Sequence, residues 1–277
     1  MSTRCARRPP RRGFGDLGRR VLFAVPAIGY AIAIIVAGGW IFAAGILVLG
    51  FVCLHELFRM YDWVRPVRLA GFLALAGLAV AALEGGERQV LLATVATLPL
   101  IFLLGLVMPR REDATLTHGM AITLFGTFWV GMAIAHAIML RGLEHGDGIV
   151  VDVLVGTFLG DTGAYLGGRW FGTHRLSPRI SPNKTVEGLV IGFLTAVLFT
   201  WAAGLYQDWL THGQALILGA AVGIVAPLGD LVESAVKRDA GTKDAGAMFG
   251  PHGGALDRLD AAFFSLVTGY YVWLALL

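Results

Sequence analysis

The sequence predicts an all-α polytopic membrane protein with about nine transmembrane helices and a cytoplasmic N-terminus. Its residues are 56% hydrophobic and only 15% charged, whereas a soluble domain carries about 25% charged residues. Apolar runs of about 18 residues or more, the length that crosses a bilayer, recur along the chain. The two cysteines, Cys5 and Cys53, do not indicate a disulfide framework.

The predicted spans follow these apolar runs in order. A basic cytoplasmic tail with seven arginines and one acid occupies residues 1–20. Transmembrane helices then fill two regions, 21–148 and 149–277. The break at Gly38-Gly39-Trp40 is so short that the first two spans could instead form one broken helix. The predicted spans are 21–37, 40–57, 69–83, 89–108, 118–139, 149–167, 187–206, 214–236 and 261–277.

The distribution of charge supports this topology. With the N-terminus in the cytoplasm, the inner segments hold all but two of the 22 basic residues. The outer segments keep only Arg88 and Arg141, beside four acidic residues. Cytoplasmic loops of membrane proteins carry such an excess of lysine and arginine. The same topology places the loop 167–185 and the charged segment 237–260 together on the cytoplasmic side.

Asp161 is the first residue that an apolar scaffold would not need. It lies inside the sixth predicted span, in the stretch FLGDTGAYLGGRWFG. An ionisable group at membrane depth costs about 2.5–3.5 kcal/mol on insertion scales, so it usually faces a cavity or a partner. The alternative is a polar packing contact among Gly160, Gly163 and Ala164. We favour a functional role for Asp161.

A second polar stretch, SPRISPNKTVEG, precedes the seventh predicted span. Lys184 and Thr185 lie just before the residues that open this span, Glu187 and Gly188. The N-terminus of a helix with free backbone N–H groups is a natural site for an anion. An ordinary helix start with Thr185 as its cap explains the stretch almost as well.

The third stretch runs from residue 229 to 260 and has more charged residues than either of the other two. Asp230, Glu233 or Ser234, and Lys237 follow the spacing of one helix face at the end of the eighth span. Further on, the motif Asp257-Arg258-Leu259-Asp260 opens the ninth span, so carboxylates from two spans converge at one depth. Oxygen ligands in this layout suit Mg²⁺, and the lysines and arginines suit phosphate. A solvated charged loop would not explain an aspartate at position 230, close to the membrane.

These residues resemble the phosphatidate cytidylyltransferases, also called CDP-diacylglycerol synthases. The family pattern S-x-x-K-R-x(4)-K-D, followed after a spacer by H-G-G-x-x-D-R-x-D, is met from Ser234 to Asp244 and from His252 to Asp260. The blocks 161–165 and 181–188 are also similar to blocks of this family. The resemblance covers residues 150–277 in detail, which makes 149–277 the expected catalytic region.

The resemblance implies that CTP and phosphatidic acid react to form CDP-diacylglycerol and pyrophosphate in phospholipid biosynthesis. It implies Mg²⁺ as the cofactor, with Asp230 and Asp257 as ligands, Asp260 and Asp244 in support, and a second cation such as K⁺ in the same site. The residues expected to act on the phosphates are Lys237, Arg238, Lys243, Asp244 and Arg258. Those expected to bind substrate are Asp161, Lys184, Thr185, Ser234, His252, Gly253 and Gly254.

The expected partners are CTP, phosphatidic acid and membrane lipid, with no nucleic acid, and the resemblance suggests a homodimer. The expected location is the inner (plasma) membrane, with the active site on its cytoplasmic side. Other functions stay open: CTP-dependent synthesis on another lipid phosphate, a CTP-dependent kinase, and a transporter or channel. A CTP-dependent polyprenol or phytol kinase would release CDP rather than pyrophosphate. A transporter or channel would be expected to carry paired broken helices in both halves of the chain, whereas the polar motifs here crowd the last 130 or so residues.

Overall fold

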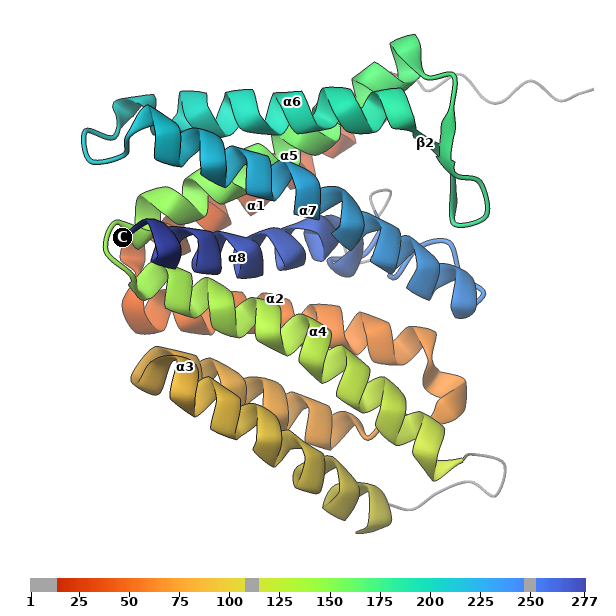
Figure 1. The fold of residues 1–277 in the computed structure, drawn as a ribbon. Helices are drawn as coiled ribbons and strands as arrows, with labels where there is room; N and C mark the ends of the chain where they lie inside the picture. The colour runs from red at the N-terminus through yellow and green to blue at the C-terminus, as the bar shows by residue number, and fades with distance from the viewer. Residues whose placement is uncertain (1–13, 108–114, 247–252) are drawn as a thin grey trace, which may run out of the picture.

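The computed structural model describes residues 14–107, 115–246 and 253–277, and the chain in these ranges is mostly helical. The start of the predicted tail and His252 lie outside them. Figure 1 shows long helices packed side by side, with a small hairpin at one end of the bundle. The helices are α1 (Phe14–Ala37), α2 (Gly39–Met60), α3 (Arg68–Val107), α4 (Leu116–Gly142), α5 (Gly146–Phe171), α6 (Val186–Ala203), α7 (His212–Asp239) and α8 (Leu256–Leu276).

Seven of the described helices, α2 to α8, are long and apolar enough to cross a membrane. The apolar part of α1, Val25–Ala37, is shorter than these seven helices. Large apolar side chains are exposed on most of these helices, as expected for surfaces that face lipid. The helical polytopic fold is therefore confirmed, while the number of nine spans and the orientation of the N-terminus stay predictions.

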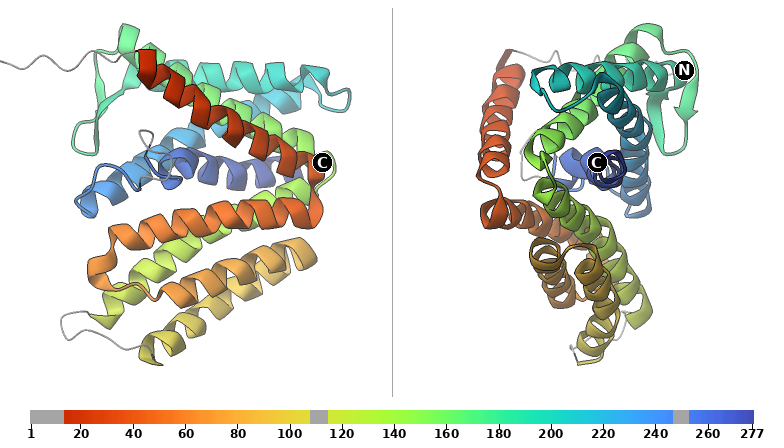
Figure 2. Two further views of the ribbon diagram at one scale, coloured as in Figure 1. Left: turned by 180° about the vertical axis from the view of Figure 1, so that it is seen from behind. Right: turned by 60° about the vertical axis from the view of Figure 1, so that its left-hand side comes forward.

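The helix α3 contains the break predicted between its two apolar runs. Within its 40 residues, Gly86 has φ 69° and ψ −156°, which is not helical. The two arms on either side of Gly86 fold back on one another, since Val67 and Ala70 share a small buried cluster with Ile101. Figure 2 shows these arms next to each other at the edge of the molecule. One glycine that tolerates a positive φ thus separates the predicted spans 69–83 and 89–108.

The first two predicted spans are separate helices. Gly38 and Gly39 both have positive φ, 62° and 48°, a conformation that other residues rarely adopt. The guanidinium group of Arg141 occupies the space beside Gly38 where a Cβ atom would lie. Its Nε donates a hydrogen bond of 2.7 Å to the carbonyl oxygen of Ile35. Arg141 therefore satisfies a free carbonyl at the end of α1 while α2 turns away.

Small residues hold α5 against α6. A Cβ atom on Gly192 of α6 would come within 2.7 Å of the Cβ of Ala164 and 3.0 Å of the carbonyl oxygen of Gly160, both on α5. A Cβ on Gly188 would come within 2.7 Å of the carbonyl oxygen of Ala164. Close approach through small residues is the usual way in which helices associate in lipid. This contact fixes Asp161 of α5 relative to the start of α6.

The sequence did not predict the antiparallel hairpin formed by β1 (Arg175–Ser177) and β2 (Ser181–Thr185). Its base is closed by Glu187, whose carboxylate accepts hydrogen bonds from the backbone N–H groups of Thr173 and His174. The backbone N–H of Val186 also donates to the carbonyl oxygen of His174 at 2.9 Å. The hairpin is a short addition outside the apolar helices, and the membrane-spanning part of the fold is all-α, as predicted.

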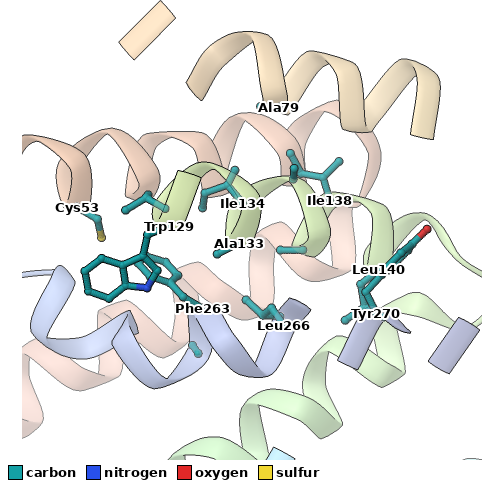
Figure 3. Close-up of a cluster of buried hydrophobic side chains, with 14 of the residues drawn as sticks. Cys53, Ala79, Trp129, Ala133, Ile134, Ile138, Leu140, Phe263, Leu266 and Tyr270 are labelled. Carbon is teal, nitrogen blue, oxygen red and sulfur yellow. The ribbon is translucent and has the colours of Figure 1, made fainter. Parts of the chain in front are cut away.

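The buried core joins the N-terminal helices to α8. Figure 3 shows Trp129 of α4 beside Phe263 of α8, with Cys53 of α2 at the edge of the cluster. The rings of Trp129 and Phe263 meet edge to face, with centroids 6.3 Å apart, a favourable arrangement for aromatic pairs. This packing fixes α8, and with it the start of α8 where the charged motif lies.

Candidate active site

The predicted site residues gather at one end of the helix bundle. The hairpin, the start of α6 and the C-terminal end of α7 all lie at this end, opposite the C-terminus of the chain (Figure 1). Lys184, the fourth residue of β2, lies beside Asp230 of α7, with its Nζ 2.6 Å from Oδ2. Ser234, one turn along α7, donates a hydrogen bond of 3.3 Å to Oδ1 of Asp230. The second and third polar stretches of the sequence thus meet at Asp230.

Lys237 bridges two carboxylates from different helices. Its Nζ lies 2.6 Å from Oε2 of Glu233, on its own helix, and 2.8 Å from Oδ1 of Asp257, on α8. The side chains of Lys237 and Glu233 are only 13% and 1% exposed, so these charges are largely withdrawn from water. Buried charges persist only where they are paired and hydrogen-bonded. Lys237 therefore joins the end of α7 to the start of α8.

Asp257 also organises the backbone before α8. Its carboxylate accepts hydrogen bonds from the backbone N–H of Ala245 at 3.0 Å and of Gly254 at 2.7 Å. Gly253, with φ 83°, takes a conformation that favours glycine. Asp257 lies in the first turn of α8, where the helix dipole stabilises a negative charge.

A group of acidic side chains nearby could hold a cation. Ligand oxygens of Asp230, Glu233 and Asp260 all lie within 4.8 Å of one another. Oε1 of Glu233 is buried and has no hydrogen-bond partner among the described residues, which leaves it available to a ligand. Carboxylate oxygens are the donors that Mg²⁺ prefers. The chemistry of this group therefore fits a magnesium ion.

Asp161 adds a further negative charge from α5. It interacts electrostatically with Asp230 and Asp260, so the first predicted polar stretch also reaches this site. Asp161 lines a small hollow of about 10 Å³ between α5, α6 and α7, with room for about one water molecule. The other lining residues are Gly156, Gly160, Ala164, Gly192, Ala196, Gly223, Ala226 and Pro227. The carboxylate of Asp161 thus lies among small residues where these three helices meet.

The other predicted site residues lie in the hairpin, at the end of α7, in the segment after it and at the starts of α6 and α8. Arg238 is exposed and donates from Nε to the carbonyl oxygen of Ile180, in the hairpin, at 3.5 Å. Lys243, Asp244 and Arg258 are also exposed. Thr185 caps α6 by accepting a hydrogen bond from the backbone N–H of Gly188 at 3.1 Å. Lys184 and Lys237 contact the acidic group directly, and cations beside carboxylates suit a polyphosphate held together with a metal ion.

The chain matches the profile of the cytidylyltransferase family over residues 18–276. It belongs to this family. It is 33% identical to a phosphatidate cytidylyltransferase of Synechocystis, over 94% of this chain and 97% of that protein. Proteins of the same name from Staphylococcus saprophyticus and Staphylococcus aureus are 30% and 31% identical, over 89% of this chain and 95% of theirs. The resemblance inferred from the charged motif is thus confirmed.

Two acidic residues at this end of the cytidylyltransferase fold were not assigned a role from the sequence. The sequence spacing offers Glu233 only as an alternative to Ser234 on one helix face, yet Glu233 lies in the acidic group with Asp230 and Asp260. Glu56 of α2 is 6% exposed and accepts a hydrogen bond from the backbone N–H of Leu256 at 2.9 Å. Its position inside the predicted span 40–57 is the same signal that singled out Asp161, an ionisable residue at membrane depth.

Proposed function

We propose that this chain is a CTP:phosphatidate cytidylyltransferase that makes CDP-diacylglycerol and pyrophosphate in phospholipid biosynthesis. The observation that carries the proposal is the meeting of Asp230, Glu233 and Asp260 with Lys184 and Lys237 at one end of an apolar bundle. Such a site is reached by a lipid head group from the membrane and by a nucleotide from water. Membership of the family and the names of the relatives support the same reaction.

The chemistry requires positioning more than proton transfer. A phosphate oxygen of phosphatidate attacks the α-phosphorus of CTP, one P–O bond forms, and the bond to the β-phosphate breaks to release pyrophosphate. The attacking oxygen is already ionised near neutral pH, so no general base is needed. The barrier arises from bringing two anions together and from charge on the departing pyrophosphate, and preorganised cations lower such barriers.

The metal ligands that we propose are Asp230, Glu233 and Asp260. When bound there, Mg²⁺ would neutralise phosphate charge and orient the α-phosphate of CTP. The ammonium group of Lys237 contacts the carboxylate of Asp257 at 2.8 Å, and so serves as the cation partner of that carboxylate. We propose that Asp257 joins the ligand set when Lys237 turns toward a substrate phosphate. Asp244, exposed at the same end, stays a proposed supporting residue.

A second cation such as K⁺ is part of the proposal for a reason of charge. Five carboxylates meet in the site, from Asp161, Asp230, Glu233, Asp257 and Asp260, and two ammonium groups contact them. Fully ionised, the five carboxylates, the two ammonium groups and one divalent ion sum to a net charge of about −1. A monovalent cation would remove this excess.

The remaining predicted residues are proposed to hold the substrates. We assign the phosphates of CTP and phosphatidate to Lys184, Lys237, Arg238, Lys243 and Arg258. Asp161, Thr185, Ser234, Gly253 and Gly254 would line the substrate site, together with His252, which lies outside the described residues. We further propose that the charged end faces the cytoplasm of a bacterium with the chain in its inner membrane, and that the chain forms a homodimer.

The proposal is tested with purified protein, CTP and phosphatidate in lipid nanodiscs. CDP-diacylglycerol should form with Mg²⁺, stop when Mg²⁺ is chelated, and form again when Mg²⁺ is restored. Asp230→Asn should lower the rate at least about 100-fold, because loss of a ligand costs no less than loss of a group that orients one. Asp208→Asn, an exposed aspartate between α6 and α7, is the matched control and should retain full activity.

Three outcomes would contradict the proposal. Absence of CDP-diacylglycerol with every preparation of folded protein would reject the function. Release of CDP and formation of a phosphorylated lipid alcohol would identify a CTP-dependent kinase. Flux of a solute across proteoliposomes without consumption of CTP would identify a transporter. Near-normal turnover by the Asp230→Asn variant would reject the proposed metal ligands alone.

A further inference from the structure

A buried carboxylate from the N-terminal half of the chain lies against the segment that carries the charged motif. Glu56 is on α2, about 200 residues before Leu256, and its Oε2 accepts a hydrogen bond of 2.9 Å from the backbone N–H of Leu256. Leu256 is the first residue of α8. The first N–H groups of a helix have no partner within the helix, and an anion there is stabilised by the helix dipole. Glu56 therefore anchors the start of α8 from another helix.

The same carboxylate lies between two glycines, Gly246 and Gly254, that both precede the charged motif at the start of α8. A Cβ atom on Gly246 would collide with Oε1 of Glu56, and a Cβ on Gly254 would collide with Oε2. The absence of a side chain at both positions leaves room for the carboxylate of Glu56 between the two backbone segments. Gly246 and Gly254, eight residues apart in the sequence, are thus brought together on one side chain.

Asp257 receives its hydrogen bonds from the backbone that Glu56 holds. The N–H groups that it accepts are those of Ala245 and Gly254, which are adjacent to or part of the glycine pair. Asp257 in turn lies 2.8 Å from Nζ of Lys237. A continuous set of contacts therefore runs from Glu56, through the backbone at 245–246 and 254–256, to Asp257 and Lys237.

Other contacts of α2 point in the same direction. The hydroxyl group of Tyr61, which follows α2, donates a hydrogen bond of 3.0 Å to the carbonyl oxygen of Val236, next to Lys237 on α7. Cys53, one turn before Glu56, is fully buried. The C-terminal half of α2 thus forms a wall of the site, although none of the charged motifs of the sequence lies on it.

We propose that Glu56 is a positioning residue of the active site, whose carboxylate holds the backbone around Gly246 and Gly254 so that Asp257 meets Lys237. Glu56 acts through that backbone and does not contact the substrates. The inference deepens the proposed function, on which its kinetic consequence rests, because it makes the N-terminal helices part of the catalytic apparatus.

The test compares Glu56→Gln, Glu56→Asp and Glu56→Ala with Asp152→Asn in lipid nanodiscs. Asp152 is the matched control: it is also a fully buried carboxylate on a helix, and its partner is Gln207 at the opposite end of the bundle, at 3.0 Å. Two quantities are measured for folded protein: kcat for CDP-diacylglycerol formation, and hydrogen–deuterium exchange of peptides that contain Gly254 and Leu256. The exchange does not depend on activity.

We expect Glu56→Ala to lower kcat about 100-fold, since a displacement of about 1 Å in a catalytic site has this effect. Glu56→Gln keeps the shape and one acceptor oxygen, so its loss should be smaller, about tenfold. Exchange at residues 254–256 should become faster in both variants. Asp152→Asn should lower the unfolding temperature while leaving kcat and the exchange at 254–256 unchanged. Glu56→Asp, which keeps the charge on a shorter stem, should fall between the wild type and Glu56→Ala.

The proposal is overturned if Glu56→Gln and Glu56→Ala turn over at the wild-type rate per folded molecule. It is also overturned if kcat falls without faster exchange, because Glu56 would then act directly on the reaction. If Glu56→Ala does not fold, Glu56→Gln and Glu56→Asp decide by the same two readouts. A wild-type protein that makes no CDP-diacylglycerol defeats the proposed function, whereas unchanged exchange in the variants defeats the role of Glu56.

Discussion

At the scale of single residues, Lys237 connects the acidic groups of two helices. Its ammonium group contacts Glu233 and Asp257 at 2.6 and 2.8 Å. Without it, two poorly solvated carboxylates would face one another, and each would lose its main charge partner. The same ammonium group is the cation that a substrate phosphate would meet first in this part of the site. Stability and activity are therefore expected to depend on Lys237 together.

Replacing Lys237 with methionine should lower the free energy of unfolding by about 3–5 kcal/mol, the usual effect of removing one partner from a buried ion pair. The double variant Glu233→Gln, Lys237→Met should lose less than the sum of the two single variants, because it no longer leaves Glu233 unpaired. Thermal unfolding in one detergent measures all three. Additive losses would mean that the two side chains do not interact energetically.

Some residues of the site could be identified from the sequence alone, and others could not. Asp161 and Asp230 could be selected because charged groups are rare and costly in apolar spans, and Lys184 because it lies just before a helix start, where an anion can bind. Glu56 carried the same signal, but its partner lies 200 residues away, and spacing along the chain does not tell which helices face each other. The pairing of Asp257 with Lys237 could not be predicted for the same reason, because this contact depends on how α8 packs against α7.

At the scale of elements, the small residues between α5 and α6 determine where Asp161 and the start of α6 lie. Gly192 can be altered without touching a charged group, because a Cβ atom there would meet Ala164 and the backbone of Gly160. A larger side chain there must push the two helices apart, and packed interfaces do not deform without a loss of free energy.

Gly192→Leu should lower the free energy of unfolding by about 1–3 kcal/mol, the usual effect of overpacking, and should reduce activity by displacing α6 from Asp161. Gly77→Leu is the control, since Gly77 is exposed on α3 and a Cβ there meets nothing within 4 Å. Thermal unfolding and turnover are measured for both. Equal behaviour of the two variants would show that the α5–α6 contact does not position the site.

The elements could be predicted to different degrees for a physical reason. In lipid every backbone polar group needs an internal partner, so a long apolar run has to be a helix. The hairpin lies outside this constraint, since its stretch, RLSPRISPNKT, is charged and contains two prolines. Its form depends on Glu187, which holds the backbone of Thr173 and His174 from the start of α6. No local pattern indicates such a contact.

At the scale of the whole molecule, the charged motifs lie at one end of the helix bundle. The hairpin and the end of α7 are at this end, and the C-terminus is at the opposite end (Figures 1 and 2). This polarity agrees with the excess of basic residues on one side of the predicted topology. A nucleotide and a lipid head group would both meet the charged end, so its orientation decides which compartment supplies the nucleotide.

Cysteine labelling in spheroplasts tests this orientation. In a chain without Cys5 and Cys53, Arg179→Cys marks the exposed hairpin and Asp208→Cys the exposed loop between α6 and α7. An impermeant maleimide should label the Asp208→Cys variant in intact spheroplasts and the Arg179→Cys variant only after lysis. The reverse pattern would place the charged end outside the cell and contradict a cytoplasmic supply of CTP.

The destination of each phosphate of CTP tests the central claim most directly. Purified protein is incubated with phosphatidate, Mg²⁺ and CTP labelled either at the α- or at the γ-phosphorus. Cytidylyl transfer predicts that the α-label enters the lipid extract as CDP-diacylglycerol and that the γ-label stays in water as pyrophosphate. A γ-label that enters the lipid, or lipid that takes up neither label, would contradict the account.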